Sequence, residues 1–551
     1  MEPVKIIPLG GLGEFGLNMM LVEYAGEAVA IDCGLMFPGA DLFGIDLVIP
    51  DISYLVEKKA ALKGIVLTHA HEDHIGALPY ILKQIEAPVF GSRLTLGLLR
   101  NKIREHGLEQ KADLREIAAG RPWQLGPFKL EGVRVTHSLM DCLAIAVETP
   151  AGVIIHTGDF KIDQTPMGGE FFDFQKFAAY GEKGVLLLLS DSTNVEREGY
   201  TPSEREVGKN LEAIFNRSHK KIFVSTFSSN IPRIQQVADI SERAGRKLIL
   251  SGRSMIKNAE ISSELGYLKL ADGTMHENEP WQKLPADQVT FLTTGSQGEP
   301  MSALHRIALD DHKSIKIEPG DAVLLSSKFI PGNERTITNL INHIYRRGAE
   351  VHYESVSEIH VSGHAAQEEL KAMLHLTRPK YFVPVHGEYR HLVRHIQLAQ
   401  AVGIPKENCF LMEDGQVLEL TSDRAEKRDT VTVGRVFVDG KGVGDVEDFV
   451  IRDRRHLSED GMVLAVMAIH RQTGEIVTGP DIVTRGFMRA GGGEEILEGA
   501  RQVVLQTLKE INRESRTDVG EVQEEVRKAL RRFFKKALAR YPVVLTFIME
   551  T

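Results

Sequence analysis

The feature that most constrains this 551-residue chain is a run of three histidines and two acidic residues within six positions. The run reads His-Ala-His-Glu-Asp-His over residues 69–74 and follows the apolar segment Gly64–Leu67. His69 and His71 are two residues apart, so an extended backbone projects both imidazoles to one side. Asp73 and His74 fall in the turn that follows and can face a second ion. Because imidazole and carboxylate groups suit Zn²⁺ and Mn²⁺, the run predicts a metal site at the end of a strand.

One such cluster cannot complete the coordination of two ions, so further ligands are expected elsewhere. Four polar residues each follow an apolar run and are candidates: Asp32, His137, Asp159 and His386. A single histidine or aspartate at a strand end is more often a cap or turn residue. Their recurrence, together with the cluster, indicates strands that end along one edge of a layered α/β domain.

Composition and charge narrow the class of protein. Apolar residues make up 42% and charged residues 26%, as in ordinary globular proteins. A net charge of −10 disfavours a basic nucleic-acid coat protein, although it allows a local basic cleft. Three cysteines are too few for a disulfide framework and fit a reducing cytoplasm. The N-terminal residues lack a signal-peptide layout, so we expect a cytoplasmic protein without a membrane segment.

The pattern of predicted strands and helices changes twice along the chain. From about Thr201, strands alternate with helices, which predicts βαβ units and a mostly parallel sheet. Polar strand ends return later, and the segment Thr421–Asp429 is charged and lacks apolar periodicity, which predicts a linker. The predicted division is residues 1–201 for the first part of a catalytic domain, 202–361 for an inserted domain, 362–420 for the second part, 421–456 for a linker and 457–551 for a small C-terminal α/β domain.

The ligand pattern resembles that of the metallo-β-lactamase superfamily. The resemblance implies an αββα sandwich whose first ion is bound by His69, His71 and His137. It implies a second ion bound by Asp73, His74 and His386, with Asp159 bridging the two. Asp32 is then a residue that orients ligands from outside the metal shell. The implied reaction is two-metal hydrolysis, with Zn²⁺ favoured and Mn²⁺ or Mg²⁺ as alternatives.

The long gap between the last ligands narrows the family. Asp159 and His386 are 227 residues apart (386 − 159), and the inserted segment resembles the β-CASP domain of nucleic-acid-processing members. Asp191, in Leu-Ser-Asp-Ser-Thr, matches the acidic motif A of that domain, and His364, in Ser-Gly-His-Ala, matches motif B. As the motif B residue, His364 is our candidate either to protonate the leaving oxygen or to stabilise its developing charge, and Asp191 is expected to orient the site. We therefore expect a catalytic set of Asp32, Asp73, Asp191 and His364.

Three further segments indicate one branch of these enzymes. Gly10–Asn18, Ser362–Ala365 and Pro384–Arg390, together with a C-terminal domain, resemble the bacterial ribonuclease J family over the whole chain. This resemblance implies a 5′-to-3′ exonuclease that prefers a 5′ monophosphate and also cleaves internally, in RNA maturation and decay. It implies single-stranded RNA as substrate and partners associated with RNA decay or the ribosome. The amphipathic helices and the apolar strand Pro542–Met549 of the C-terminal domain predict a homodimer, or a homotetramer.

Two polar turns in the inserted segment are candidates for the 5′ phosphate. Ser228 and Asn230 follow one apolar run and Arg253 follows another, each before a predicted helix whose N-terminus can attract phosphate. A guanidinium suits a terminal phosphate, although ordinary helix capping explains such turns equally well. Ser362, Gly363 and His364 are added to this set because glycine lets the backbone approach a phosphate closely.

Other functions remain open at this stage. The nearest alternative is another β-CASP nuclease that acts on different RNA ends or on DNA. A dinuclear hydrolase of small molecules is disfavoured by the long insertion, and a non-catalytic scaffold by the full ligand set. The segment from Gly11 to Gly16 fits a dinucleotide-binding pattern, but the strand-like residues Met19–Tyr24 leave no room for the helix that such a site needs.

Overall fold

A computed structural model describes residues 2–39, 41–58, 61–168, 170–330, 333–354, 356–488, 493–512 and 515–551. The chain divides into two compact units, which are described separately. The first consists of Met1–Phe37 and Val48–Val436, and the second of Pro38–Leu47 and Phe437–Thr551. Within the described residues, no helix is both long and apolar enough to cross a bilayer.

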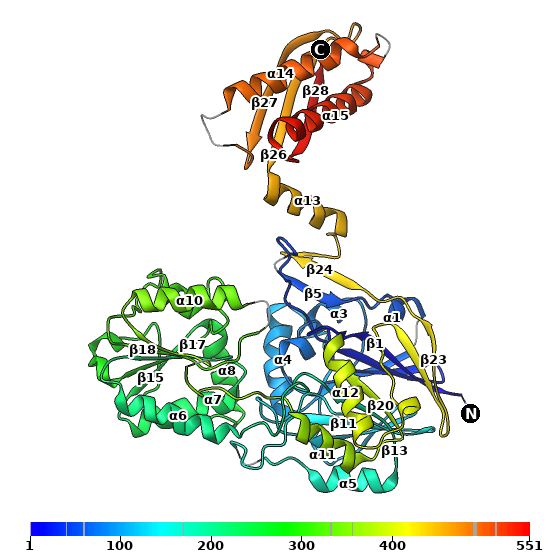
Figure 1. Ribbon diagram of the computed structural model, residues 1–551. Helices are drawn as coiled ribbons and strands as arrows, with labels where there is room; N and C mark the ends of the chain where they lie inside the picture. Colours follow the sequence, from blue (N-terminus) through cyan, green and yellow to red (C-terminus); the bar gives the residue numbers. More distant parts are fainter. Residues whose placement is uncertain are drawn as a thin grey trace. The chain divides into compact units, whose positions relative to one another are not determined.

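The first unit is built on two sheets that share one core (Figure 1). The eight-stranded sheet has the order β23-β22-β1-β3-β4-β6-β7-β8, and the six-stranded sheet has the order β20-β13-β12-β11-β10-β9. Buried residues of both, such as Val22 and Val66 from one and Ile145 and Leu187 from the other, belong to the same apolar cluster. Strands of the first sheet are β1 (Val4–Gly10), β3 (Met19–Tyr24), β4 (Glu27–Ile31), β6 (Ala61–Val66), β7 (Val89–Gly91), β8 (Leu114–Glu116), β22 (Gln416–Leu420) and β23 (Ala425–Thr430). Strands of the second are β9 (Trp123–Leu125), β10 (Phe128–Arg134), β11 (Leu143–Thr149), β12 (Gly152–His156), β13 (Val185–Asp191) and β20 (Tyr381–Val385).

The chain leaves this sandwich after β13 and returns to it at β20. The two strands are parallel neighbours, with Asp191 opposite Val385, so residues far apart in sequence end at the same edge. The helices of the sandwich are α1 (Ser53–Lys58), α2 (Glu72–Ile75), α3 (Leu78–Ile81), α4 (Arg93–Glu105), α5 (Phe174–Lys183), α11 (Gln367–Thr377) and α12 (Tyr389–Ala401). Because β13 pairs with β20, residues that precede the insertion and residues that follow it can form one site.

The inserted segment forms a parallel sheet of six strands in the order β16-β15-β17-β14-β18-β19, which confirms the predicted βαβ arrangement. Helices α6, α7 and α8 bury apolar residues against one face, and α9 and α10 against the other. The strands are β14 (Ile222–Ser225), β15 (Lys247–Ser251), β16 (Met275–His276), β17 (Val289–Thr293), β18 (Ala322–Leu325) and β19 (Glu350–His352). The helices are α6 (Glu204–Arg217), α7 (Ile231–Arg243), α8 (Arg253–Glu264), α9 (Ala303–Ala308) and α10 (Glu334–Arg346).

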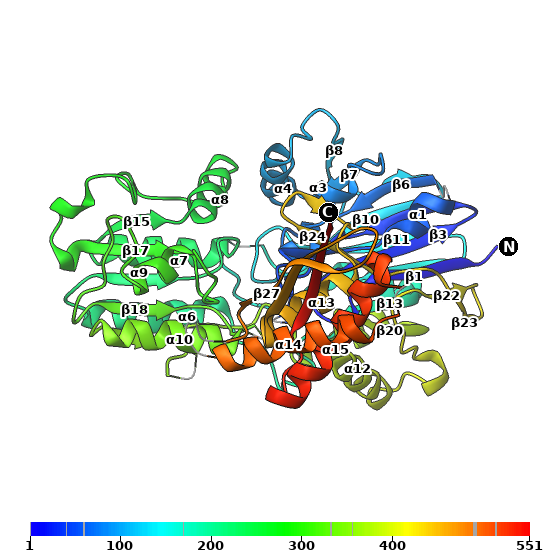
Figure 2. The same cartoon turned by 90° about the horizontal axis from the view of Figure 1, so that it is seen from above.

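Close contacts join the inserted segment to the sandwich. Helices α4 and α8 lie side by side (Figure 2), and a Cβ added to Gly97 would meet Leu265 at 2.4 Å. Deeper in the interface, the Arg233 guanidinium donates to the Glu204 carboxylate at 2.6 Å, and the backbone N–H of Glu204 donates to Asp163 at 3.1 Å. The Glu204 carboxylate also lies 3.7 Å from the ammonium of Lys161 in the sandwich, and both side chains are buried, so separating the two parts would break this ion pair. The orientation of the inserted segment is therefore fixed by buried polar contacts.

The second unit contains an open three-stranded sheet in the order β27-β26-β28. Its strands are β26 (Met462–Ile469), β27 (Ile476–Arg485) and β28 (Val543–Glu550), and its helices are α13 (Asp448–Asp460), α14 (Glu494–Glu510) and α15 (Val519–Leu538). Helices α14 and α15 share an apolar core with Val463, Ala465, Val544 and Ile548. Residues that alternate with these point to the other face, where Leu545, Phe547 and Met549 are exposed. The unit therefore presents an apolar sheet face.

Residues 421–456, which the sequence predicts as a linker, contain regular secondary structure. They include strand β23, which pairs antiparallel with β22, and most of helix α13. The apolar pattern is missing because β23 is an edge strand whose side chains are largely exposed, and charged residues suit such an edge. The five-part domain division is finer than the two compact units and stays a prediction.

Candidate metal centre

The cluster at residues 69–74 lies where β6 ends and α2 begins, with His71 as the residue that precedes the helix. A neighbouring loop after β4 holds it in place. There, the N–H of Cys33 donates to the His74 carbonyl at 2.7 Å, and the N–H of Leu35 donates to that of Glu72 at 3.0 Å. A Cβ on Gly34 would lie 1.6 Å from the Asp73 carbonyl oxygen, so only glycine allows this approach.

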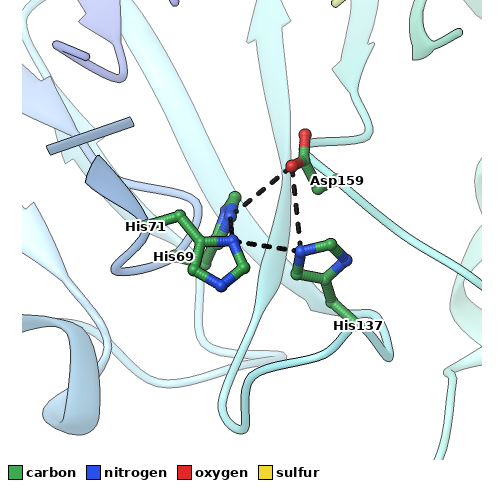
Figure 3. Close-up of side chains that lie close together, drawn as sticks. All are labelled: His69, His71, His137 and Asp159. Atoms are coloured by element: carbon green, nitrogen blue, oxygen red, sulfur yellow. Dashed lines mark hydrogen bonds and ion pairs between the residues drawn. The ribbon is translucent and has the colours of Figure 1, made fainter. Parts of the chain in front are cut away.

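The first group of side chains is His69, His71, His137 and Asp159, shown in Figure 3. Nε2 of His69 lies 3.0 Å from Nδ1 of His71, which lies 3.2 Å from Nε2 of His137. Oδ2 of Asp159 is 3.6 Å from the His69 nitrogen and 3.8 Å from the His137 nitrogen. Three imidazole nitrogens and one carboxylate oxygen therefore converge on a single point.

A second group uses the same aspartate together with Asp73, His74 and His386. Nε2 of His74 lies 3.3 Å from Oδ2 of Asp159 and 3.6 Å from Oδ2 of Asp73. Nε2 of His386 lies 3.1 Å from that same Asp73 oxygen. The structure therefore brings all seven predicted ligands into two adjoining groups that share Asp159.

The predicted catalytic pair adjoins the same aspartate. Nδ1 of His364 lies 2.8 Å from Oδ2 of Asp191 and 3.9 Å from Oδ2 of Asp159. His386 lies between the groups, with its Nδ1 at 3.5 Å from Oδ1 of Asp191. Asp159, Asp191, His364 and His386 also converge closely enough to hold an ion.

Several contacts outside the two groups fix the imidazoles. Asp32 accepts hydrogen bonds from the backbone N–H and hydroxyl of Thr68, both at 2.8 Å, and lies 2.7 Å from Nδ1 of His74. The carbonyl of Gly363 lies 2.7 Å from Nδ1 of His137. Each contact occupies one ring nitrogen and leaves the other facing the centre, as partners of metal-binding histidines do.

Two polar residues that the sequence reasoning did not single out also orient these groups. The Thr193 hydroxyl lies 2.5 Å from Nδ1 of His386, and the Asn18 amide donates to the Asp73 carbonyl at 2.9 Å. Both stand inside segments that were quoted for other residues, Leu-Ser-Asp-Ser-Thr and Gly10–Asn18. Their position in those segments was the available signal.

Burial keeps the first three histidines neutral. It lowers the pKa of His69 well below its ordinary value, helped by the nearby charge of His74, and it lowers the pKa of His71 to about 4. Burial and the neighbouring His364 also hold the pKa of His137 well below its ordinary value. Neutral imidazole is the form that binds a metal ion.

The second group is instead a network of opposite charges. Burial alone would lower the pKa of His74, but Asp159, Asp73 and Asp32 raise it well above its ordinary value. The pKa of His386 rises to about 10, against the effect of burial, because of Asp159, Asp191 and Asp73. The carboxylates around His74 and His386 therefore favour a positive charge at this part of the centre, either on the imidazoles or on a bound cation.

The donor set fits divalent ions. Histidine nitrogens and aspartate oxygens are the ligands that Zn²⁺ and Mn²⁺ take in proteins. Oδ1 of Asp159 is buried and accepts no hydrogen bond from any residue that the structure describes, although Nδ1 of His386 lies 3.7 Å away. A buried carboxylate oxygen without a donor is costly unless a cation is close.

Solvent reaches the centre at Asp73 and His364. The side chains of Asp73 and His364 are 34% and 20% exposed, whereas those of His69 and Asp159 are almost fully covered. His137 also lines a cavity of about 710 Å³. Six carboxylates are among its lining residues, namely Asp141, Asp163, Glu170, Glu204, Asp239 and Glu242. Their charge disfavours a phosphodiester backbone there, so the open side suits a polyanion better.

The predicted phosphate-binding residues lie in two loops, at residues 228–230 and 362–364, and at Arg253, the first residue of α8. Ser228 accepts hydrogen bonds from the Asn258 amide of α8, which brings the first turn next to the helix that Arg253 begins. Oδ1 of Asn230 accepts the N–H of Arg233 and so caps α7. Arg253 is exposed, and the hydroxyl of Ser362 accepts the N–H of His364.

Four family descriptions match the chain. "Metallo-beta-lactamase superfamily" covers residues 12–191, and "Zn-dependent metallo-hydrolase RNA specificity domain" covers residues 348–412. "Ribonuclease J, beta-CASP domain" covers residues 219–344, and "Ribonuclease J C-terminal domain" covers residues 449–551.

Similar proteins match over nearly the whole chain. Ribonuclease J of Thermus thermophilus is 44% identical, with 100% of this chain and 96% of the relative covered. Ribonuclease J 1 of Streptococcus pyogenes is 43% identical (99% and 97%), and Ribonuclease J2 of Bacillus subtilis is 40% identical (100% and 99%). A crystal structure of a protein of unknown function from Enterococcus faecalis has a TM-score of 0.53 at 16% identity, with 76% of this chain and 100% of that chain covered, and supports the fold alone.

The sandwich, its parallel insertion and these matches define a metallo-β-lactamase-type hydrolase with a β-CASP domain and a C-terminal domain, which confirms the predicted fold class. The chain belongs to the ribonuclease J family. It is accordingly a metal-dependent ribonuclease, its substrate is RNA, and its His/Asp cluster indicates a divalent metal site.

Substituting Gly363 by alanine tests the contact between the Gly363 carbonyl and His137. The added Cβ would lie 2.6 Å from the His137 ring, so the ring or the loop must move. We expect Gly363→Ala to weaken metal affinity about 10- to 100-fold, the usual effect of losing a partner that orients a ligand. Titration against a chromophoric zinc chelator measures this affinity. Gly434→Ala is the control, because its Cβ would have its nearest neighbour at 3.6 Å; equal affinities for the two variants would contradict the expectation.

Proposed function

We propose that this ribonuclease degrades RNA from the 5′ end, prefers a 5′ monophosphate and also cleaves internally, using two divalent ions. The observation that carries the proposal is the pair of ligand groups that share Asp159 and open toward solvent beside His364. Zn²⁺ is the favoured ion, with Mn²⁺ and Mg²⁺ as alternatives, because neutral imidazoles make up most of the first group.

In this proposal, His69, His71 and His137 would hold one ion and Asp73, His74 and His386 the other, with Asp159 shared by the two groups. Bound ions would supply a nucleophilic water of lowered pKa and neutralise charge on the phosphoryl oxygens. Asp32 and the Gly363 carbonyl keep His74 and His137 in the orientation that presents a free nitrogen. Single-stranded RNA approaches from the side of Asp73 and His364.

His364 is proposed to give a proton to the leaving 3′ oxygen. Its side chain is partly exposed, whereas its Nδ1 lies 2.8 Å from the buried Asp191 carboxylate. Asp191 thereby fixes the ring and leaves Nε2 free to reach the substrate. Proton transfer by a positioned histidine typically contributes about 10²–10⁴-fold in rate.

Separate substitutions distinguish a proton donor from a metal ligand. His364→Ala should lower single-turnover cleavage about 10²–10⁴-fold while metal content and RNA affinity stay unchanged. His386→Ala should lower metal content as well, because His386 is a proposed ligand. Metal content is measured by emission spectrometry, with His375→Ala, an exposed histidine on α11, as control. Loss of metal from His364→Ala would make His364 a ligand instead, and near-normal cleavage would remove its catalytic role.

The 5′-phosphate site is proposed at the carboxyl ends of the inserted sheet. Hydroxyl residues gather at this edge: Ser225 at the end of β14 and Thr226 directly after it, Ser251 at the end of β15, Thr293 at the end of β17 and Ser326 after β18. Ligands of parallel sheets bind at such an edge. Ser228, Asn230 and Arg253 extend from it, and Ser362, Gly363 and His364 would contact the RNA nearer the metals.

Removing the guanidinium tests this site. Arg253→Ala should slow exonuclease cleavage of 5′-monophosphorylated RNA about tenfold or more, because a hydrogen bond to a charged group is worth about 1.5–3 kcal/mol. Internal cleavage of the 5′-triphosphorylated RNA should not change. Arg243→Ala on α7 is the control, since Arg243 is exposed and pairs with Glu212. Gel analysis of both RNAs and of matched DNA gives the rates, and equal losses in both modes would refute a dedicated pocket.

A homodimer is proposed to form through the exposed face of the C-terminal sheet, and a tetramer could form from two such dimers. The register places Leu464 beside Leu545 and Val466 beside Phe547 on that face. A contiguous apolar face marks an interaction site, and a second copy can cover it symmetrically. Partners from RNA decay or the ribosome rest on the family resemblance alone, and a cytoplasmic location is supported by three cysteines that are free thiols.

A charge on that face should prevent assembly. Phe547→Glu should convert the dimer to a monomer, because a buried unpaired carboxylate in the interface is strongly unfavourable. Light scattering after gel filtration gives the molar mass. Phe171→Glu in the first unit is a matched control, since Phe171 is 60% exposed and Phe547 is 58% exposed. An unchanged mass for Phe547→Glu would show that this face is not the interface.

A further inference from the structure

Glu369 is a fully buried carboxylate in the first turn of α11 that belongs to none of the ligand groups. Its two oxygens accept three backbone N–H groups. Oε1 accepts that of Ile162 at 2.7 Å, and Oε2 accepts those of Thr201 at 2.7 Å and Ala366 at 2.8 Å. A helix capping box accounts for the bond to Ala366 only. The other two bonds reach segments that are distant in the sequence.

The three donors come from the three segments that build the active site. Ile162 is three residues after Asp159, Thr201 lies where the chain crosses into the inserted domain, and Ala366 is two residues after His364. A single carboxylate therefore ties together the bridging aspartate, the domain crossover and the loop of the proposed proton donor. Buried backbone N–H groups need such an acceptor, so the three segments are held at one point.

Residues of the segment that leads into the inserted domain, Asn194 and Thr201, also bind the backbone of His364 directly. The Thr201 hydroxyl donates to the His364 carbonyl at 2.8 Å, and the Asn194 amide donates to that carbonyl at 3.3 Å. Glu369 thus holds Thr201 by its N–H, and Thr201 holds His364 by its hydroxyl. The loop has little freedom between these contacts and the 2.8 Å contact of His364 with Asp191.

We propose that Glu369 is a positioning residue for the cleavage step, which sets the place of His364 through the Thr201 crossover and the Ala366 backbone. The inference rests on the proposed role of His364. Glu369 touches neither ligand group, so its removal should leave RNA affinity and metal content in place. It should reduce turnover because a shift of about 1 Å in a reacting group can cost on the order of 10²-fold.

Glutamine is the sharpest substitution because it changes one acceptor only. A carboxylate offers acceptors on both oxygens, whereas an amide offers one oxygen and one NH₂ donor. In Glu369→Gln the NH₂ group must therefore face at least one of the three N–H groups. The size of the side chain stays the same, so packing is preserved.

A matched control exists at the other end of the inserted sheet. Asp321, directly before β18, is fully buried and accepts the N–H groups of Lys221 at 3.1 Å and Glu318 at 2.8 Å. Asp321→Asn makes the same chemical change in a carboxylate that binds backbone N–H groups away from the catalytic loop. It reports what the loss of a buried acceptor does to the protein in general.

The experiment is a double-mutant cycle on the full-length, metal-loaded enzyme with 5′-monophosphorylated RNA. Glu369→Gln should lower kcat at least about tenfold with KM and metal content within about twofold of the parent. On the His364→Ala background, Glu369→Gln should lower kcat less than about threefold, because the group that it positions is absent. Asp321→Asn should leave kcat near the parent value on both backgrounds.

Three results would overturn the proposal: an unchanged kcat for Glu369→Gln, the same fold loss on both backgrounds, or an equal loss in Asp321→Asn. If Glu369→Gln does not fold, Thr201→Val decides, since it removes only the hydroxyl bond to His364; an unchanged kcat there also overturns the proposal. Near-normal cleavage by His364→Ala alone would refute the role of His364 and is read separately from the effect of Glu369→Gln.

Discussion

The carboxylate of Asp159 belongs to all three groups of side chains that could hold an ion among the described residues. It is buried and faces His69, His74, His137, His364 and His386. Because a buried charge needs compensation, the surrounding histidines and any bound cation are arranged around this one group. Burial lowers the pKa of His69, whereas Asp159, Asp73 and Asp32 raise the pKa of His74 against the effect of burial.

This arrangement depends on backbone that is held in unfavourable conformations. Asp32 and His386 have φ values of 62° and 56°, in the left-handed region that residues other than glycine rarely adopt. Such strain persists where neighbouring contacts fix the chain, and it clusters at functional sites. The hydrogen bonds of Asp32 to Thr68 and of His386 to Thr193 are contacts of this kind. The geometry of the centre is therefore maintained at some cost to the stability of the fold.

The local sequence pattern was sufficient to predict part of the site. The spacing of His69, His71, Asp73 and His74 after a strand predicts their convergence because a short turn leaves little choice. The parallel inserted sheet was equally readable, since its strands and helices alternate. The charged strand β23 was not, because an exposed edge strand has no apolar face to create a pattern. The role of Glu369 could not be predicted from the sequence either, since a glutamate in the first turn of a helix is usually an ordinary capping residue.

By itself, the sequence determined the type of chemistry: a histidine and aspartate set suited to divalent ions, and a family resemblance that extends over the chain. Only the tertiary structure decided which distant residues meet. The parallel pairing of β13 with β20 brings His386 beside Asp191, and one buried carboxylate joins the Asp159, Thr201 and His364 segments. The reason is physical: side-chain spacing within one strand or turn is set by local geometry, whereas contacts between separate segments are set by sheet register and by the need of buried polar groups for partners.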